Sequence, residues 1–100
     1  MSTPSDIPNL HDAVLESIEV RWDAGEADIS LTRVPGGPLL LKARGLRRFV
    51  LSHEQEWGPS IYVNHATVAS DERGRAVMEI EMQSGDTISV IADHVTPSQG

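Results

Sequence analysis

The histidines are the residues of this chain with the most versatile chemistry, because an imidazole can bind a metal or carry a proton near neutral pH. His11-Asp12 and Asp93-His94 are mirror-image dipeptides near the two ends of the 100-residue chain. If the first and last strands of a small barrel meet, these four side chains converge into a ligand set suited to Zn²⁺ or another divalent cation. The alternative interpretation is four histidine and aspartate side chains that are hydrogen-bonded locally in loops.

Hydrolytic residue types also occur together, at Ser52-His53-Glu54. Side chains that are adjacent in the sequence point apart, so these three cannot form the hydrogen-bonded chain of a catalytic triad. The chain has no cysteine, which excludes disulfides and thiolate metal sites. We therefore expect no enzymatic activity and no cofactor.

A short basic segment is a stronger indication of function than the histidines or Ser52-His53-Glu54. Half of the eight basic residues fall within seven positions, namely Lys42, Arg44, Arg47 and Arg48. All 15 acidic residues lie outside residues 29–53, and the formal net charge of the chain is −7. The charge is therefore segregated along the sequence.

Three interpretations of this basic segment remain open. Cations on one face of a strand guard a sheet edge against aggregation. They also pair with acids on a neighbouring strand, for which Glu79 and Glu81 are candidates. In the third interpretation the segment is a docking patch for an acidic protein.

The two tryptophans are candidates for contact residues. Trp22 stands at the end of a predicted strand, and Trp57 stands in the loop Glu56-Trp-Gly-Pro-Ser60. Tryptophans at loop ends often plug a core, but tryptophan and arginine are also the residue types enriched at interface anchors. For partner contact we choose Trp57 together with the basic segment.

The composition limits which other kinds of partner the chain can bind. A net charge of −7 repels nucleic acid and anionic membranes. The apolar runs, such as Leu39–Leu41, are too short to span a membrane, and the first residues lack the basic and apolar regions of a signal peptide. The absence of cysteine agrees with a reducing compartment. We expect a cytoplasmic protein that binds neither nucleic acid nor membranes.

Residues 77–92 show the clearest structural pattern, because apolar and polar residues alternate on both sides of Ser84-Gly85-Asp86. A period of two is typical of half-buried strands. Gly85 suits the left-handed position of a three-residue hairpin loop with a bulge. The resulting register places Ile80 opposite Ile88 and Met78 opposite Val90.

Similar patterns elsewhere predict six or seven antiparallel strands in one all-β domain over residues 9–95. We expect a meander that forms a small sandwich or barrel, with at most one short helical turn. Gly45 predicts a bulge or bend within an apolar-basic run. Residues 1–8 and 96–100 are expected to be disordered tails. The remaining strands are predicted over residues 14–22, 27–34, 39–44 and 60–68, and residues 46–51 either continue the strand at 39–44 or begin another.

Several short motifs resemble a group of small uncharacterised bacterial proteins, some of which are similar to immunity proteins of polymorphic toxin systems. The motifs are Leu10-His-Asp-Ala-Val-Leu-Glu-Ser-Ile18 with Trp22, Trp57-Gly-Pro-Ser60, and Glu79-Ile-Glu-Met-Gln-Ser-Gly-Asp86. The resemblance implies an all-β fold, no cofactor and a protein partner.

The favoured hypothesis is a non-enzymatic protein-binding module in a bacterial cytoplasm, of the immunity or accessory type. Its predicted contact residues are Lys42, Arg44, Arg47, Arg48 and Trp57. One alternative is the small-ligand or metal-binding barrel that uses His11, Asp12, Asp93 and His94. Another is a homodimer formed by edge-strand pairing through residues 39–51.

Overall fold

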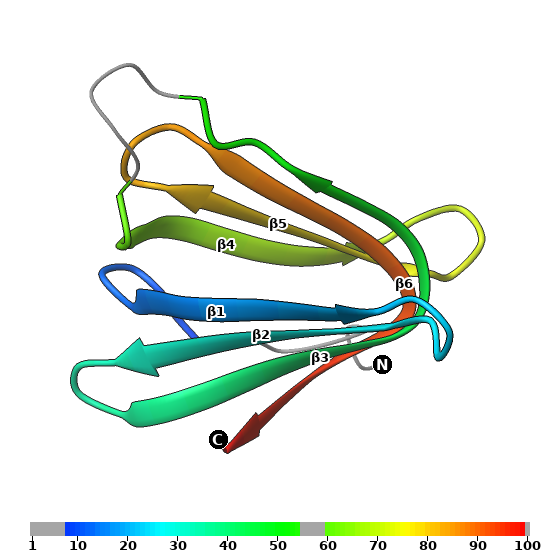
Figure 1. Ribbon diagram of the computed structural model, residues 1–100, viewed down its shortest axis with the longest axis horizontal. Coiled ribbons are helices and arrows are strands. Elements are labelled where there is room, and N and C mark those ends of the chain that lie inside the picture. The colour runs from blue at the N-terminus through cyan, green and yellow to red at the C-terminus, as the bar shows by residue number, and fades with distance from the viewer. Residues whose placement is uncertain (1–7, 55–59, 100) are drawn as a thin grey trace.

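The computed structural model describes residues 8–54 and 60–99, and within them it is built entirely from antiparallel strands (Figure 1). The all-β prediction is confirmed, and no helix occurs in the described residues. The six strands are β1 (Val14–Arg21), β2 (Glu26–Arg33), β3 (Gly37–Leu51), β4 (Val63–Ser70), β5 (Ala76–Met82) and β6 (Thr87–Gln99).

The strands form one sheet in the order β1-β2-β3-β6-β5-β4. Consecutive strands are neighbours within β1–β3 and within β4–β6, so each half is a meander, as expected. The order departs from a meander after β3, because β4 lies at the far edge of the sheet and β6 lies beside β3. The two longest strands, β3 and β6, therefore join the halves. Both bend on the same side of the molecule, which folds the sheet over on itself (Figure 1).

Gly45 is the point at which β3 bends. Its φ angle is 67°, a left-handed conformation that glycine adopts without steric penalty. The register with β6 shifts between Leu46 and Arg48, which is a β-bulge. The predicted bulge or bend at Gly45 is confirmed, and residues 46–51 continue the strand that begins before residue 39, which is one of the two expected alternatives.

Hydrogen bonds bridge the two edges of the sheet at one end. Asp12 donates its backbone N–H to Val63 O (2.8 Å), and Val63 donates to Ala13 O (2.9 Å). Leu15 donates to Ile61 O (2.8 Å). The start of β1 is thereby tied to the segment before β4, so the folded sheet is partly closed. A β-turn over residues 10–13, with Asp12 at a φ of 67°, leads into this closure.

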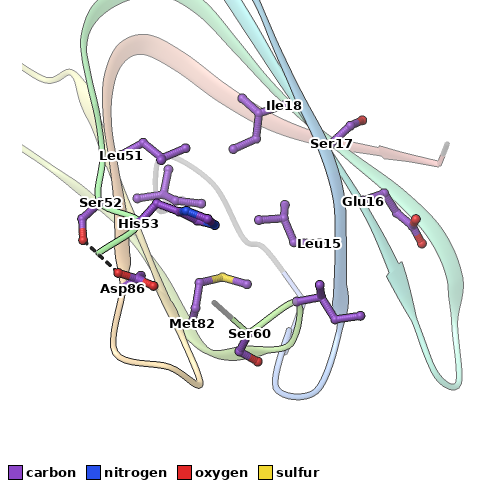
Figure 2. A pocket seen from close by; sticks show the side chains of 12 residues that line it. Leu15, Glu16, Ser17, Ile18, Leu51, Ser52, His53, Ser60, Met82 and Asp86 are labelled. Atoms are coloured by element: carbon purple, nitrogen blue, oxygen red, sulfur yellow. Dashed lines mark hydrogen bonds between the residues drawn. The ribbon is translucent and has the colours of Figure 1, made fainter. Parts of the chain in front are cut away.

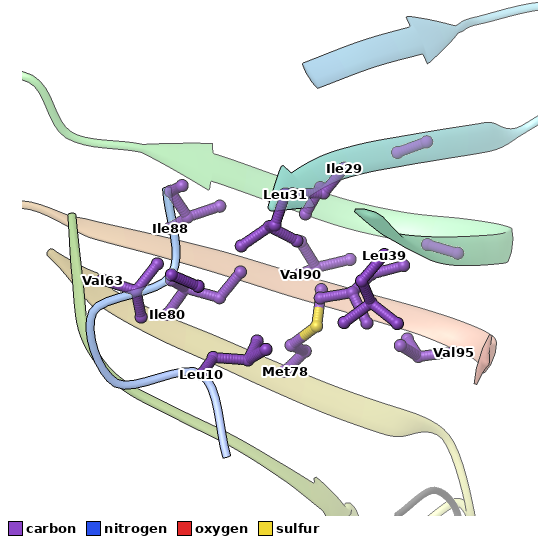
Figure 3. Close-up of a cluster of buried hydrophobic side chains, with 14 of the residues drawn as sticks. Leu10, Ile29, Leu31, Leu39, Val63, Met78, Ile80, Ile88, Val90 and Val95 are labelled. Carbon is purple, nitrogen blue, oxygen red and sulfur yellow. The ribbon is translucent and has the colours of Figure 1, made fainter. Parts of the chain in front are cut away.

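The apolar residues at every second position of the strands pack together between the two halves of the folded sheet (Figure 3). Ile80 pairs with Ile88 and Met78 with Val90, so the predicted hairpin register is confirmed. Gly85 has a φ of 98° and donates its N–H to Met82 O (2.9 Å), which closes the predicted loop. Burying each such aliphatic side chain contributes roughly 1.5–3 kcal/mol to folding.

The predicted tail at residues 96–100 is wrong through residue 99. Residues 96–99 belong to β6 and pair with β3, where Leu39 lies opposite Gln99. A long partner strand supplies the backbone hydrogen bonds that a short polar sequence cannot supply alone. Residues 1–7 of the tail predicted at 1–8 lie outside the described residues, as does Trp57. The described ranges contain no helix that is long and apolar enough to cross a membrane.

Candidate functional site

The basic segment lies in the middle of the sheet. β3 pairs with β2 on one side through residues 37–44 and with β6 on the other along most of its length. The guarded-edge interpretation is therefore wrong for Lys42 and Arg44, which have a strand on both sides. Beyond Arg44, β3 pairs only with β6 among the described residues, and the homodimer through residues 39–51 stays a prediction. Glu79 and Glu81 lie on β5, which is not a neighbour of β3, so they are not its ion-pair partners.

Arg44 belongs to an ionic cluster on the outer face of β1, β2 and β3. Its Nη1 lies 2.9 Å from Asp28 Oδ1, and its Nε lies 3.3 Å from Glu26 Oε2. Arg21 binds the same two acids from β1, at 2.9 Å each, and reaches Glu19 at 3.0 Å. The two arginines thus share two carboxylates, Arg21 binds a third, and the ion pairs of Arg44 lie within the fold.

Burial of Asp28 raises its pKa, but hydrogen bonds from Arg44 and Arg21 outweigh that effect and hold the pKa below its usual range. Lys42 lies on the same outer face, opposite Asp28 on β2 and Thr96 on β6, and is half-buried. Arg44 is therefore paired with the acids of β2, and Lys42 lies opposite one of them in the register.

Arg47 is the extra residue of the bulge after Gly45. Its Nε and Nη2 each donate a 3.1 Å hydrogen bond to the carboxylate of Asp93 on β6. This fork geometry raises the pKa of Arg47 and lowers that of Asp93. More than half of the Arg47 side chain nevertheless remains accessible, so its outer edge can still contact a partner.

Arg48 is exposed and has no ion-pair partner in residues 8–54 and 60–99. It borders a surface groove of about 340 Å³ that lies between the β1–β2 turn and the second half of β3. We call it the Trp22 groove. Its lining residues are Val20, Arg21, Trp22, Gly25, Leu46, Arg47, Arg48 and Phe49.

Trp22 is 93% exposed. The interpretation of this tryptophan as a core plug is therefore wrong. The turn that carries it is held in place, because Gly25 O accepts the N–H of Leu46 at 2.8 Å. This bond joins the β1–β2 turn to β3 just after the bend. The tryptophan is thus displayed on a fixed turn while its ring remains in contact with solvent.

The floor of the Trp22 groove is apolar and continues the inner face of the sheet. Leu46 pairs with Ala92 and Phe49 with Val90, both of which are core positions. Val20 on β1 remains 45% exposed. An apolar floor, an exposed indole and two accessible guanidinium groups match the composition of protein-interface anchors.

A second cavity, of about 260 Å³, lies between the two halves of the sheet. Figure 2 shows Leu15 and Ile18 of β1 facing Leu51 and Met82 across it. Asp86 stands at its side and is almost completely buried. Chain segments that immediately precede and follow residues 55–59 border this cavity, through His53 and Ser60.

Asp86 anchors the segment that follows β3. Its carboxylate accepts hydrogen bonds from the backbone N–H of Glu54 (2.9 Å) and the hydroxyls of Ser84 (2.9 Å) and Ser52 (3.3 Å). The Glu54 bond is the main cause of its lowered pKa. Both serines bond the carboxylate directly, with no imidazole between them. The described residues therefore do not form a catalytic triad here.

The predicted convergence of the histidine–aspartate dipeptides is wrong. His11 Nδ1 lies 2.8 Å from Asn64 O, and Asp12 accepts a hydrogen bond from Gln83. His94 lies opposite Arg44 at the centre of the sheet. No group of three or more metal-binding side chains occurs in the part of the chain that the structure describes. His11 thus contacts the start of β4, whereas His94 lies in the pairing of β6 with β3.

Sequence reasoning placed the contact tryptophan at position 57 and did not select Val20, Trp22 and Phe49 as one surface. Two signals point toward it: the Trp22 ring at the end of a hairpin, and Gly45 followed at once by two arginines. Neither signal places the two segments side by side, because that contact depends on the direction in which β3 bends.

The fold is similar to a crystal structure of an uncharacterized protein from Neisseria gonorrhoeae, with a TM-score of 0.68 and 14% sequence identity. The match covers 93% of this chain and 97% of that chain. At this identity the likeness shows a shared fold alone. No family model and no curated protein matches the sequence. The resemblance to immunity proteins stays a prediction.

Proposed function

We propose that this protein is a non-enzymatic binding module that holds an acidic protein at the Trp22 groove. The observation that carries the proposal is a tryptophan 93% exposed beside two accessible arginines. Exposing an indole to water is unfavourable, and a partner that covers it gains the free energy of burying a large apolar surface. The absence of cysteine supports a cytoplasmic setting.

Charge supports an acidic partner. Arg48 has no ion-pair partner in the described ranges, and Arg47 presents one side of its guanidinium beyond Asp93. Arginine matches a carboxylate with two parallel hydrogen bonds, so an acidic side chain on the partner would bind both strongly and directionally. The remaining surface carries the negative excess of the chain and would repel the same partner.

The test begins with capture of partners from the native host's lysate, followed by affinity measurements on the purified captured protein. Trp22→Ala should weaken binding by about thirtyfold, which corresponds to a hot spot of about 2 kcal/mol. Tyr62→Ala is the matched control, because Tyr62 is another exposed aromatic residue and lies outside the groove. It should change the affinity by less than about threefold.

Charge-reversal variants distinguish binding at the Trp22 groove from a general effect of net charge. Arg48→Glu should weaken binding and flatten its dependence on salt, because a direct ion pair is lost. Arg73→Glu changes the net charge equally but lies in the exposed turn between β4 and β5. Equal effects of the two reversals, or full affinity in Trp22→Ala, would contradict the proposal.

A further inference from the structure

The two edge strands of the sheet are protected very differently. β1 carries charged side chains along its length, among them Glu16, Glu19 and Arg21, and has a bulge between Leu15 and Ser17. Charges and bulges are the devices by which proteins keep an edge strand from pairing with another chain. β1 is therefore a guarded edge.

β4, the opposite edge, lacks these devices over most of its length. Its sequence Val63-Asn-His-Ala-Thr-Val-Ala-Ser70 contains no aspartate, glutamate, lysine, arginine or proline. Valine and threonine favour strands. The only register shift lies at its beginning, between Val63 and His65.

The beginning of β4 is already occupied, whereas the remainder is open. Val63 bonds Asp12 and Ala13, and His11 Nδ1 bonds Asn64 O. Beyond Asn64, residues 65–70 pair only with β5 among the described residues. Alternate N–H and C=O groups of this six-residue stretch therefore face outward without a strand partner. Ala66 and Val68 are only partly buried at the rim of the core, so an added strand would also cover apolar surface.

We propose that the open edge of β4 pairs with β4 of a second copy of this chain, antiparallel about a twofold axis at Thr67. In this register Thr67 lies opposite its own copy, a cross-strand pair that is favourable in sheets. His65 lies opposite Ala69, and Ala66 opposite Val68, so a larger side chain meets a smaller one on each face. No like charges are opposed within the paired strands.

The acids nearest to this edge do not prevent the pairing. Glu79 and Glu81 lie on β5, one strand inward, opposite Thr67 and His65. Across the new interface the two β5 strands are three strand spacings apart, about 14 Å, which exceeds the screening length of about 8 Å at physiological salt. Since each copy carries a net charge of −7, added salt should strengthen self-association. Added salt should weaken partner binding at the Trp22 groove, so the two interfaces respond in opposite directions.

Sedimentation equilibrium over a wide concentration range, at low and high salt, tests the pairing. The wild-type protein should dimerise, more tightly at high salt. Thr67→Lys places two ammonium groups opposite each other and should raise the dimer dissociation constant at least about fivefold. Thr87→Lys is the matched control, because Thr87 is exposed but lies on β6 and pairs with Glu81 away from either edge. It should leave the dissociation constant unchanged.

Single cysteines report the register, since the natural chain has none. Thr67→Cys should be joined to its copy by a short thiol cross-linker. Ala69→Cys should not, because the two copies of residue 69 are offset by four residues, about 14 Å along the strand. Trp22→Ala should leave the dimer intact, so loss of partner binding and loss of pairing are separable results.

A protein that sediments as a monomer at every concentration and salt overturns the pairing and leaves the edge to another occupant. A dimer that Thr67→Lys does not weaken, or that is cross-linked equally well from Ala69→Cys, overturns it as well, because the contact then lies elsewhere or in another register.

Discussion

Gly45 and Asp93 lie so close together that a β-carbon on Gly45 would overlap the Asp93 carboxylate. The glycine bends β3, and the same carboxylate holds Arg47 in the bulge. Three residues on two strands thus determine where the sheet folds over, and the fold brings the second half of β3 beside the β1–β2 turn.

Gly45→Ala should be strongly destabilising. The left-handed φ costs about 1–2 kcal/mol for a residue with a β-carbon, and the overlap adds to it, so we expect a loss of about 2–4 kcal/mol in the free energy of unfolding. Urea denaturation measures this loss. In an Asp93→Ala background the overlap with the carboxylate disappears and only the contact with the β-carbon of residue 93 remains, so Gly45→Ala should cost less stability there. Strictly additive effects of the two substitutions would contradict the contact.

Arg44→Glu and Arg48→Glu should differ although both reverse one charge. The first places a third carboxylate beside Glu26 and Asp28 and removes the cation that they share, so it should cost about 1–3 kcal/mol of stability. The second lies on an exposed residue and should change stability by less than about 0.5 kcal/mol. The urea denaturation midpoints of the two variants, measured under the same conditions, test this difference in stability.

Stability should fall in acid because several carboxylates have lowered pKa values, Asp86 and Asp28 among them. A carboxylate whose pKa is lower in the folded than in the unfolded protein stabilises the fold. This stabilisation is fully present above the unfolded pKa, near pH 4, and is lost as the pH falls through the pKa of the folded state. Melting temperatures should therefore be flat around neutrality and decline below about pH 4. Asp86→Asn should be less stable at neutral pH and show a shallower decline, whereas Glu72→Gln, an exposed carboxylate in the β4–β5 turn, should follow the wild type.

Trp22→Ser should leave stability almost unchanged, within about 0.5 kcal/mol, because the side chain is 93% exposed. The outcome matters for the proposed function, since a stable variant that has lost its partner locates the defect in binding. A loss of several kcal/mol in the free energy of unfolding, measured by heat or urea, would instead indicate that Trp22 packs in the core.

Short-range patterns predicted the parts of this fold that are built from short-range contacts. The hairpin of Met78 and Ile80 with Ile88 and Val90 followed from a period of two and one glycine, because both strands and their turn lie within about fifteen residues. The bend at Gly45 followed from a glycine inside a strand pattern. The pairing of β3 with β6 did not follow, because it joins segments that lie far apart in the sequence.

The sequence by itself determined the class of the fold, the position of the bend, the hairpin register and the segregation of charge, since each depends on neighbouring residues. Only the tertiary structure decided that β3 is central, that Arg44 is committed to Glu26 and Asp28, and that Trp22 stands exposed beside Arg47 and Arg48. These facts depend on which strands meet across long connections. That choice is made by the total burial and pairing of the sheet, a sum over distant residues that no local pattern contains.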